Sequence, residues 1–400
     1  MRVALVTGEY PPVLGGVGDY TARLAQALQA RGCESVVITA ETAALDVRQP
    51  AVERERGEAR EPAVMRLSTQ WGWDTKGKML QALQLCQPEV VHIQYQTGAY
   101  GQHPAINLLP DQLHRRMRVP VVVTAHDLLL PYLFPKADVL RRWVTRRLLR
   151  GAAAVIVTND EDQGRLQGRV VGDRQHASEY NLPCQLIPIG SNIAPRPAQG
   201  FDRDNWRAEH GLAGMQNIGY FGLMNASKGV LELVRAVARL RSAACLVIIG
   251  GAATNAQDRA YASDVRALIS ELGLQERVVW TGPCSQEEVS AYLLACDVIA
   301  LPFTDGASYR RGSLLAALVH GCPVLTTQPQ VQLNPHLEDG VAARIVPDAE
   351  PVDLAAALEE LLQDAVLCRR LGAGAKALAE YFRWPAIAAA HEVVYNAVIR

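Results

Sequence analysis

The chain has 400 residues, of which 49% are hydrophobic and 20% are charged, so it is long enough for two domains with apolar cores. Its 40 Lys and Arg residues balance 41 Asp and Glu residues, giving a formal net charge of -1. This balance argues against a protein built to neutralise many nucleic-acid phosphates, and nucleic acid is not an expected partner.

Cysteine usage and the start of the chain predict a cytoplasmic protein. The eight cysteines are spread singly without a C-x-x-C pair, which favours free buried thiols over disulfides or a metal site. Residues 1–5 begin directly with an apolar strand-like segment, so no signal peptide is expected. No apolar run approaches the roughly 18 residues of a membrane-spanning helix.

In the first half, short β-like segments alternate with helical patterns, which predicts an α/β fold with parallel sheets covered on both faces by helices. A helix over 17–30 follows the first strand. Residues 41–63 are highly charged and predict a solvated surface loop. The predicted strands of this half cover residues 3–7, 35–39, 90–93, 121–124, 154–158 and 185–188.

A segment rich in Pro and Gly, residues 189–200, shows neither helical nor strand periodicity and predicts a linker. We place the linker proper at 191–200, between a first domain over 1–190 and a second over 201–384. A long Ala- and Leu-rich helical region is predicted over 353–381, and a proline break precedes a last helix over 385–400. The predicted strands of this half cover residues 217–221, 245–249, 277–281, 297–301 and 324–326.

A glycine-rich loop joins the first strand to the first helix, with glycines at positions 15, 16 and 18. The G-G-x-G spacing does not fit the dinucleotide-binding fingerprint. Glycines at a helix N-terminus let backbone N–H groups approach a phosphate or a sugar hydroxyl closely, whereas a plain tight turn is the structural alternative.

Polar and aromatic side chains follow two further strands of the first half. His126 and Asp127 end a β-branched strand, so both are expected at the carboxyl edge where α/β sheets bind ligands. Amides and aromatic rings gather after the strand over 90–93, a mixture typical of sugar binding, with loop packing as the alternative. The predicted acceptor cleft consists of Gln94, Tyr95, Gln96, Tyr100 and His103.

The second half combines cations with a helix N-terminus. Lys228 starts an amphipathic helix after a strand that ends at Gly222, although a solvated lysine is the ordinary alternative. Residues 297–327 predict strand, loop, helix, turn and strand, with Arg310 and Arg311 just before the helix. Two arginines beside a helix N-terminus, past the carboxyl end of a parallel strand, predict an anion site, and a diphosphate is the expected ligand.

These segments resemble the retaining glycosyltransferases of family GT4, and the resemblance covers nearly the whole chain. It implies the GT-B fold, in which two Rossmann-like, doubly wound parallel-sheet domains face each other across a cleft and the terminal helix crosses back to the first domain. It also implies metal-independent transfer of a sugar, with retention of configuration, from a nucleotide-diphosphate sugar to a glycan, lipid or small-molecule acceptor. No cofactor is expected.

The resemblance assigns roles to individual residues. His126 is placed against the transferred sugar and Lys228 on the diphosphate, and these two are the predicted catalytic residues. The family usually has arginine at the position of Leu223 and glutamates at the positions of Ser308 and Ala316, so neither the sugar nor the base is predicted. The predicted donor-binding residues are Gly16, Gly222, Lys228, Gly250, Gly282, Pro283, Ser308, Tyr309, Arg310, Arg311, Gly312 and Ser313.

Several alternatives remain open. A non-catalytic relative that binds a nucleotide or sugar, a sugar-nucleotide 2-epimerase and a retaining disaccharide phosphorylase share the fold. Two D-x-D pairs, at 160–162 and 202–204, match a metal-binding spacing, but helix capping or solvation is the expected role. The basic helix over 140–150 is expected to turn Trp and Leu to the core, with peripheral contact to anionic lipid as the alternative.

Overall fold

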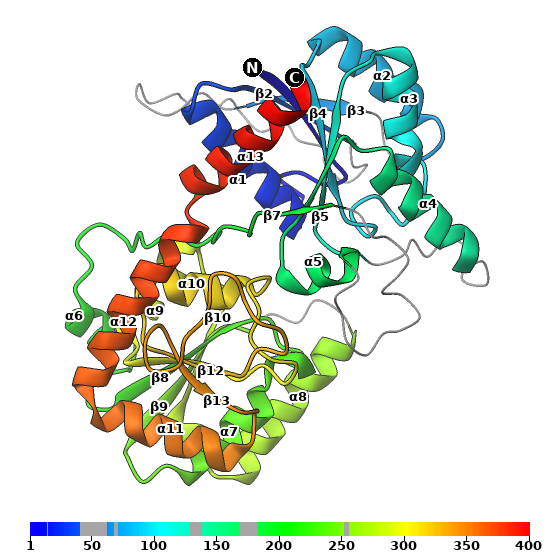
Figure 1. The fold of residues 1–400 in the computed structure, drawn as a ribbon. Helices are drawn as coiled ribbons and strands as arrows, with labels where there is room; N and C mark the ends of the chain where they lie inside the picture. Colours follow the sequence, from blue (N-terminus) through cyan, green and yellow to red (C-terminus); the bar gives the residue numbers. More distant parts are fainter. Residues whose placement is uncertain (14, 41–61, 68–70, 129–137, 168–182, 252–255) are drawn as a thin grey trace. The chain divides into compact units, whose positions relative to one another are not determined.

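The computed structural model describes residues 1–13, 15–40, 62–67, 71–128, 138–167, 183–251 and 256–400 (Figure 1). The chain divides into two compact units. Unit 1 comprises Met1–Gly190 with Trp384–Arg400, and unit 2 comprises Ser191–Arg383. Each unit is a parallel β-sheet with helices packed against it, which confirms the predicted fold class of two Rossmann-like parallel-sheet domains.

Unit 1 is built on a seven-stranded sheet in the order β3-β2-β1-β4-β5-β6-β7. Strand β1 pairs in parallel with both β2 and β4, so the direction in which strands are added reverses between β1 and β4. The strands are β1 (Arg2–Thr7), β2 (Glu34–Ala40), β3 (Ala63–Leu67), β4 (Val90–Tyr95), β5 (Val121–Ala125), β6 (Ala154–Val157) and β7 (Gln185–Leu186). The helices are α1 (Gly16–Ala30), α2 (Thr75–Cys86), η1 (Ile106–Leu108), α3 (Leu109–Arg116), α4 (Asp138–Arg150), α5 (Asp160–Leu166) and α13 (Trp384–Ile399).

The last helix, α13, packs against α1 on unit 1 (Figure 1, red beside blue). Ile387 and Tyr395 share a hydrophobic core with Leu24 of α1. At the start of α13, the Trp384 ring lies 5.3 Å from that of Tyr20. The far end of the chain is therefore part of the first core.

Unit 2 has a six-stranded parallel sheet in the order β10-β9-β8-β11-β12-β13, and its direction reverses between β8 and β11. The strands are β8 (Gln216–Gly222), β9 (Ala244–Gly250), β10 (Val278–Gly282), β11 (Val298–Leu301), β12 (Val324–Thr327) and β13 (Arg344–Val346). The helices are α6 (Arg203–Glu209), η2 (Ala226–Lys228), α7 (Val230–Arg239), α8 (Ala256–Glu271), η3 (Gln275–Arg277), α9 (Gln286–Ala295), α10 (Gly312–His320), α11 (Pro351–Gln363), α12 (Ala365–Ala379) and η4 (Glu380–Phe382).

The helical region predicted over 353–381 is two helices, α11 and α12, followed by the short η4. Asp364 separates α11 from α12 because its carboxylate accepts hydrogen bonds from the backbone N–H groups of Val366 and Leu367, at 2.9 and 2.8 Å. An aspartate in that position is a strong N-cap, so it starts a new helix and ends the previous one.

The prediction for the basic helix α4 is wrong in part. Leu148 and Leu149 are buried, but Leu140 and Trp143 are exposed, at 45% and 47% of their surface. The Arg147 guanidinium lies 5.1 Å from the Trp143 ring, which holds the indole on the outside of the helix. The loop predicted over 41–63 lies outside the described residues, except that Ala63 already belongs to β3.

Candidate functional site

Several of the predicted donor residues lie at the point in unit 2 where strand order reverses. Gly222 ends β8 and Lys228 follows it in η2, while Arg311 and Ser313 follow β11. In open α/β sheets, the carboxyl ends of the two strands at such a reversal flank the usual ligand crevice. The structure thus places these four residues at or after the ends of β8 and β11, the two strands at the reversal.

Lys228 and Arg311 converge on one aromatic ring. Lys228 Nζ and the central carbon of the Arg311 guanidinium each lie 5.1 Å from the centre of the buried Phe303 ring, just after β11. Lys228 precedes Gly229, whose φ of +65° brings the backbone so close to Pro302 that a Cβ would lie 1.9 Å from its carbonyl oxygen. This glycine allows the lysine to reach the end of β11.

The electrostatic surroundings of Lys228 are positive. Burial, together with the neighbouring Arg311 and Arg310, lowers the pKa of this amino group to about 8, and Asp305 opposes the shift. Cations held close together in a partly buried place favour an anion, because it relieves both repulsion and desolvation.

Arg311 is held in place and Arg310 is not. The Arg311 side chain, 14% exposed, forms an ion pair with Asp305 and donates a hydrogen bond to Ser227 Oγ at 3.3 Å. Its Nε is buried and has no hydrogen-bond partner among the residues that the structure describes. Arg310 is exposed to solvent.

The start of α10 offers further unpaired donors. The N-cap position, Arg311, provides no side-chain cap for the helix. Ser313 Oγ is buried without a hydrogen-bond partner in the described part of the chain, and it lies 3.8 Å from where a Cβ on Gly222 would stand. Buried polar groups are normally paired, so these donors indicate where oxygen atoms of a ligand would complete the site.

The other predicted donor residues differ in what they can offer. The prediction that the Tyr309 side chain binds the donor is corrected. Its ring is buried against Phe382, and its hydroxyl donates to the Pro335 carbonyl at 2.8 Å, so only its backbone is left to contact a ligand. Ser308 is also buried. Gly250 and Gly282 end β9 and β10 with positive φ and open space at the Cβ position, and Pro283 follows Gly282.

The family usually has an arginine at the position of Leu223 and a glutamate at the position of Ala316. In this chain Leu223 is 44% exposed, and Ala316 is fully buried within α10. Neither position therefore supplies a charge to the site.

The glycine-rich loop of unit 1 already holds an anion. The Glu9 carboxylate accepts hydrogen bonds from the backbone N–H groups of Val17 and Gly18, at 3.1 and 3.3 Å, at the N-terminus of α1. Gly15 lies so close that a Cβ there would overlap this carboxylate. A donor phosphate would meet Glu9 at these amides, so of the three glycines predicted in this loop Gly16 is the one left available to a ligand.

His126 follows β5 at the carboxyl edge of the first sheet and is half-buried. Its Nε2 lies 2.9 Å from Gln94 Oε1, and its ring meets Tyr20 edge to face at 4.7 Å between centroids. Burial and, to a smaller extent, the nearby His391 lower the pKa of the imidazole to about 3. The side chain is therefore neutral at physiological pH and serves as a hydrogen-bonding group.

The predicted acceptor cluster needs a correction. Tyr95 and Tyr100 are fully buried in the core, and the Tyr100 hydroxyl donates towards the backbone oxygens of Val6 and Gln94, at 3.1 and 3.0 Å. Gln94 is fully buried as well. These rings have no face left for a sugar, because Tyr95 at the end of β4 and Tyr100 in the following turn both pack into the core, so their role is structural.

Gln96 and His103 are half-buried and remain available. His103 meets Trp73 edge to face at 5.0 Å, and Trp73 is 57% exposed. The sequence reasoning missed Trp73 because it lies before α2, far along the chain from His103. An exposed tryptophan in a W-G-W turn was the available signal.

The two D-x-D pairs both lie at helix starts, where capping or solvation is the expected role. The Asp202 carboxylate accepts from the Asn205 backbone N–H at 2.9 Å and caps α6. Asp160 and Asp162 lie in the first turn of α5, which Asn159 caps. Within the described ranges, no group of three or more His, Cys, Asp or Glu side chains is arranged to hold a metal ion.

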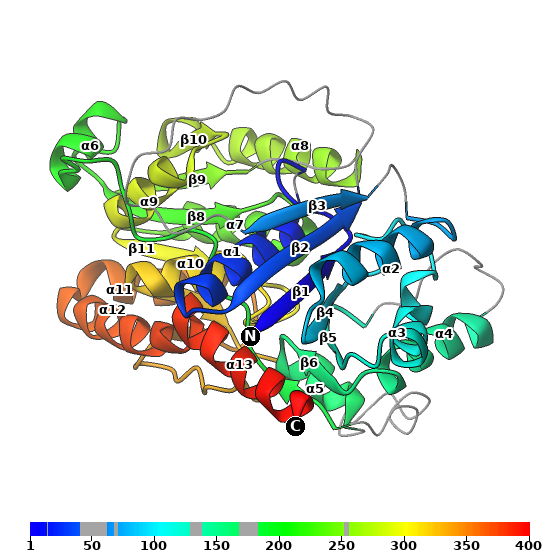
Figure 2. The same cartoon turned by 90° about the horizontal axis from the view of Figure 1, so that it is seen from above.

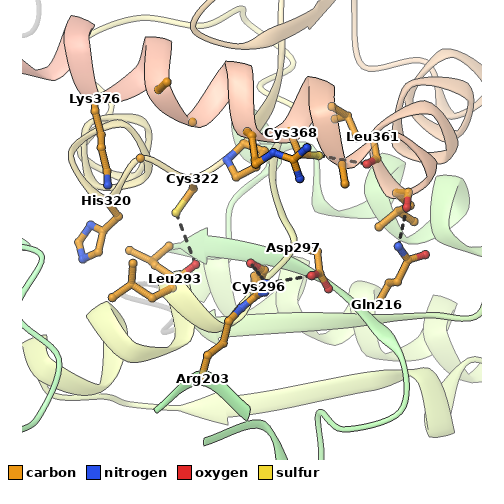
Figure 3. A pocket seen from close by; sticks show the side chains of 18 residues that line it. Arg203, Gln216, Leu293, Cys296, Asp297, His320, Cys322, Leu361, Cys368 and Lys376 are labelled. Atoms are coloured by element: carbon orange, nitrogen blue, oxygen red, sulfur yellow. Dashed lines mark hydrogen bonds and ion pairs between the residues drawn. The ribbon is translucent and has the colours of Figure 1, made fainter. Parts of the chain in front are cut away.

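A cavity of about 640 Å³ opens at the opposite, amino edge of the second sheet (Figure 3). Several of its polar side chains bond to backbone carbonyls: Gln216 donates to the Leu362 carbonyl, and the Cys322 thiol to the Leu293 carbonyl. Arg203 likewise pairs with the Cys296 carbonyl and with Asp297. Because these groups are committed to the fold, we place the functional site at the carboxyl edge.

Comparison with known proteins identifies the family of this chain. The family described as "Glycosyl transferase 4-like domain" matches residues 15–177, and the family described as "Glycosyl transferases group 1" matches residues 215–364. The chain belongs to the group 1 (GT4) glycosyltransferases. Both matched segments contain the predicted site residues of their unit, namely His126 in the first and Lys228 and Arg311 in the second.

Two curated relatives illustrate the range of this family. The chain is 27% identical over 284 residues to an alpha-D-kanosaminyltransferase from Streptomyces kanamyceticus, covering 67% of this chain and 68% of the relative. It is also 27% identical over 408 residues to a D-inositol 3-phosphate glycosyltransferase from Arthrobacter sp. (strain FB24), covering 96% of this chain and 90% of the relative. The first name specifies the sugar that is transferred, and the second specifies D-inositol 3-phosphate.

Among solved structures, Anabaena HepE in complex with UDP superposes with a TM-score of 0.74 at 18% identity, covering 99% of this chain and 100% of that one. At this identity the likeness establishes the GT-B fold. In the described part of the chain, no helix is both long and apolar enough to cross a membrane.

Proposed function

We propose that this protein transfers a sugar from a nucleotide-diphosphate sugar to an acceptor hydroxyl, with retention of configuration and without a metal ion. The proposal depends mainly on the convergence of Lys228 and Arg311 on Phe303, beside the uncapped start of α10. Two fixed cations and free helix N–H groups provide charge and donors that suit the two phosphates of such a donor. The complex of HepE with UDP supports a nucleoside diphosphate as the first ligand to test.

In the proposed reaction, the bond between the anomeric carbon and the diphosphate oxygen breaks, while the acceptor oxygen bonds to the same face of that carbon. The acceptor proton passes to the departing diphosphate oxygen. Lys228, Arg311 and the N–H groups of α10 stabilise the negative charge that develops on this leaving group. The charge is neutralised by side chains, so the proposal requires neither a metal ion nor a protein nucleophile.

His126 is proposed to orient the transferred sugar, the role that the family resemblance assigns to it. Its low pKa makes it neutral, so it supplies one hydrogen-bond donor and one acceptor, rather than a proton. The acceptor is proposed to contact Trp73, Gln96 and His103, of which the tryptophan offers a free aromatic face.

The direct test incubates the purified protein with UDP-, GDP- and ADP-sugars, and measures their binding by calorimetry and the release of nucleoside diphosphate. Binding of one donor class, with slow release of nucleoside diphosphate, is the expected result. An α-configured sugar released from an α-configured donor, recorded by NMR before it mutarotates, is the result expected for retention. If none of the donors binds, the proposal is wrong, and an inverted product would overturn retention. Proton exchange at sugar C2 in heavy water would identify the 2-epimerase alternative, and a requirement for free phosphate the phosphorylase.

The affinity for the donor is expected to fall as the pH rises through about 8. Lys228 has a lowered pKa of about 8, so it is charged below that pH and loses its charge above it. Calorimetric titration of a nucleotide sugar between pH 6.5 and about 9.5 checks this, because a diphosphate diester has no ionisation of its own there. A Lys228→Met variant should bind weakly with little pH dependence, and an unchanged slope in that variant would contradict the assignment.

Replacing Trp73 by Ala is expected to raise the KM for the acceptor about fivefold to tenfold, since loss of a stacked ring costs roughly 1–1.5 kcal/mol. The KM for the donor should not change. Trp143→Ala is the matched control, because it removes another half-exposed tryptophan of unit 1. Equal effects of both substitutions on the acceptor KM would argue against an acceptor site at Trp73.

Peripheral contact with an anionic membrane stays a prediction. The exposed Leu140 and Trp143 lie on α4, whose last turn is basic. Apolar side chains among arginines are typical of helices that rest on anionic lipid. Co-sedimentation with phosphatidylserine vesicles would test this contact, and no sedimentation at low salt would exclude it.

A further inference from the structure

A buried polar network lies directly behind His126. Gln94 Oε1 accepts from His126 Nε2 at 2.9 Å, and the Gln94 amide nitrogen lies 3.2 and 3.3 Å from the two ring nitrogens of His92. His92 in turn lies 2.7 Å from both the Tyr395 hydroxyl of α13 and the Thr124 hydroxyl of β5. Gln94 and His92 are fully buried.

The amide of Gln94 has one preferred orientation in this network. A nitrogen that is equally distant from both ring nitrogens of His92 must lie over the face of that ring. The face of a neutral aromatic ring is electron-rich and attracts an N–H group, whereas it repels a carbonyl oxygen. The amide nitrogen therefore faces His92, and the amide oxygen faces His126.

His92 is held in a fixed position, so that the face of its ring can act as a platform for the Gln94 amide. Its two ring nitrogens both have hydroxyl partners, from Tyr395 and Thr124, which fix the plane of the ring from two sides. Burial, together with the neighbouring His391 and His126, lowers the pKa of His92 well below its usual value. The ring is thus neutral, and its face can accept the amide N–H group.

The orientation of Gln94 decides which nitrogen of His126 carries the proton. An amide oxygen only accepts hydrogen bonds, so His126 Nε2 must be the protonated nitrogen. Nδ1 then carries a lone pair, and it has no hydrogen-bond partner among the described residues. We propose that Gln94, supported by His92, is a positioning residue that holds His126 as the Nε2–H tautomer and leaves Nδ1 to accept a hydrogen bond from a substrate hydroxyl.

The catalytic consequence of this inference rests on the proposed function, whereas the tautomer does not. The first experiment therefore records ¹⁵N shifts of labelled histidines, since protonated and bare ring nitrogens differ strongly. In the intact protein, His126 is expected to be protonated at Nε2, and its signal is assigned by its loss in His126→Ala. A His126 ring protonated at Nδ1 would overturn the proposal, whatever the activity.

Gln94→Met keeps the size of the side chain but removes the amide. His126 should then show a mixture of tautomers, and kcat should fall about tenfold or more, the effect typical of losing the partner that orients a functional group. The donor KM should stay within about twofold, because the diphosphate is held in unit 2. An unchanged tautomer in this variant would contradict the proposal.

Two further variants separate positioning from simple destabilisation. Asn107→Leu removes another buried hydrogen bond of unit 1, from the Asn107 amide to the Tyr95 hydroxyl at 2.9 Å, and should lower the melting temperature without changing the His126 tautomer. Gln94→Glu places a carboxylate against Nε2, so the pKa of His126 should rise from about 3. A pKa that does not move would show that residue 94 does not contact this ring. If the tautomer responds as expected while no transfer is detected in the intact protein, the proposed function fails and the positioning role stands.

Discussion

Lys228→Met is expected to reduce kcat/KM for the donor about 100-fold or more, because it removes a cation aimed at the charge that develops on the leaving diphosphate. Methionine keeps the packing of the aliphatic chain against Phe303, so the loss should reflect charge alone. The lowered pKa of Lys228 means that burying its charged form costs stability at neutral pH. The variant should therefore be far less active than the original protein and at least as stable.

Steady-state kinetics, together with thermal unfolding at pH 7, measure both parts of this result. Lys376→Ala is the matched control, since it removes an exposed lysine of the same unit. Lys376 is on α12, and its side chain lies against Gly321 and not against Phe303. Lys228→Arg should recover part of the activity by restoring a cation. If Lys228→Met keeps normal kinetics, the diphosphate does not bind here.

His126→Ala is expected to lower kcat by about 10- to 100-fold while the dissociation constant of the donor changes little. The reason is that His126 is proposed to orient the sugar, whereas the diphosphate contacts lie in the other unit. Because the pKa of His126 is about 3, the activity of the intact protein should show no ionisation near pH 6.5 that disappears in this variant. Rapid-quench kinetics and calorimetry separate the two parameters.

His114→Ala provides the comparison for His126→Ala. His114 lies exposed in the last turn of α3 within the same unit, so its removal should leave both parameters unchanged. A normal kcat for His126→Ala would exclude any role of this ring in transfer. A large rise in the donor dissociation constant instead would show that the imidazole binds the donor in its ground state.

The sequence predicted most strands because those in the middle of both sheets are apolar over their whole length, as with Val298–Leu301. It missed β3 and β13, which lie at the edges of their sheets. An edge strand is partly solvated, as β3 shows with only Leu67 buried, so its apolar pattern is weak. The break at Asp364 was missed because a single capping residue interrupts an otherwise continuous Ala and Leu pattern.

For the site, residue type and position after a strand were enough to single out Lys228, Arg311 and His126. They were not enough to tell which neighbouring side chains face inward, so Tyr95 and Tyr100 were predicted as ligand contacts. The Glu9 carboxylate at the N-terminus of α1 and the Trp73 ring beside His103 are placed by how the loops fold back. Periodicity and spacing carry no information about such partners.

The packing of α13 on α1 determines when the core of unit 1 can be completed during protein synthesis. Residues 384–400 leave the ribosome after the whole of unit 2, yet Ile387 and Tyr395 fill the core of the unit whose translation began first. The earlier unit must therefore wait, with part of its apolar interior open to water, until the later one has been made. Tyr395 also brings the hydroxyl that fixes His92, so the imidazole platform is finished only when that last segment docks.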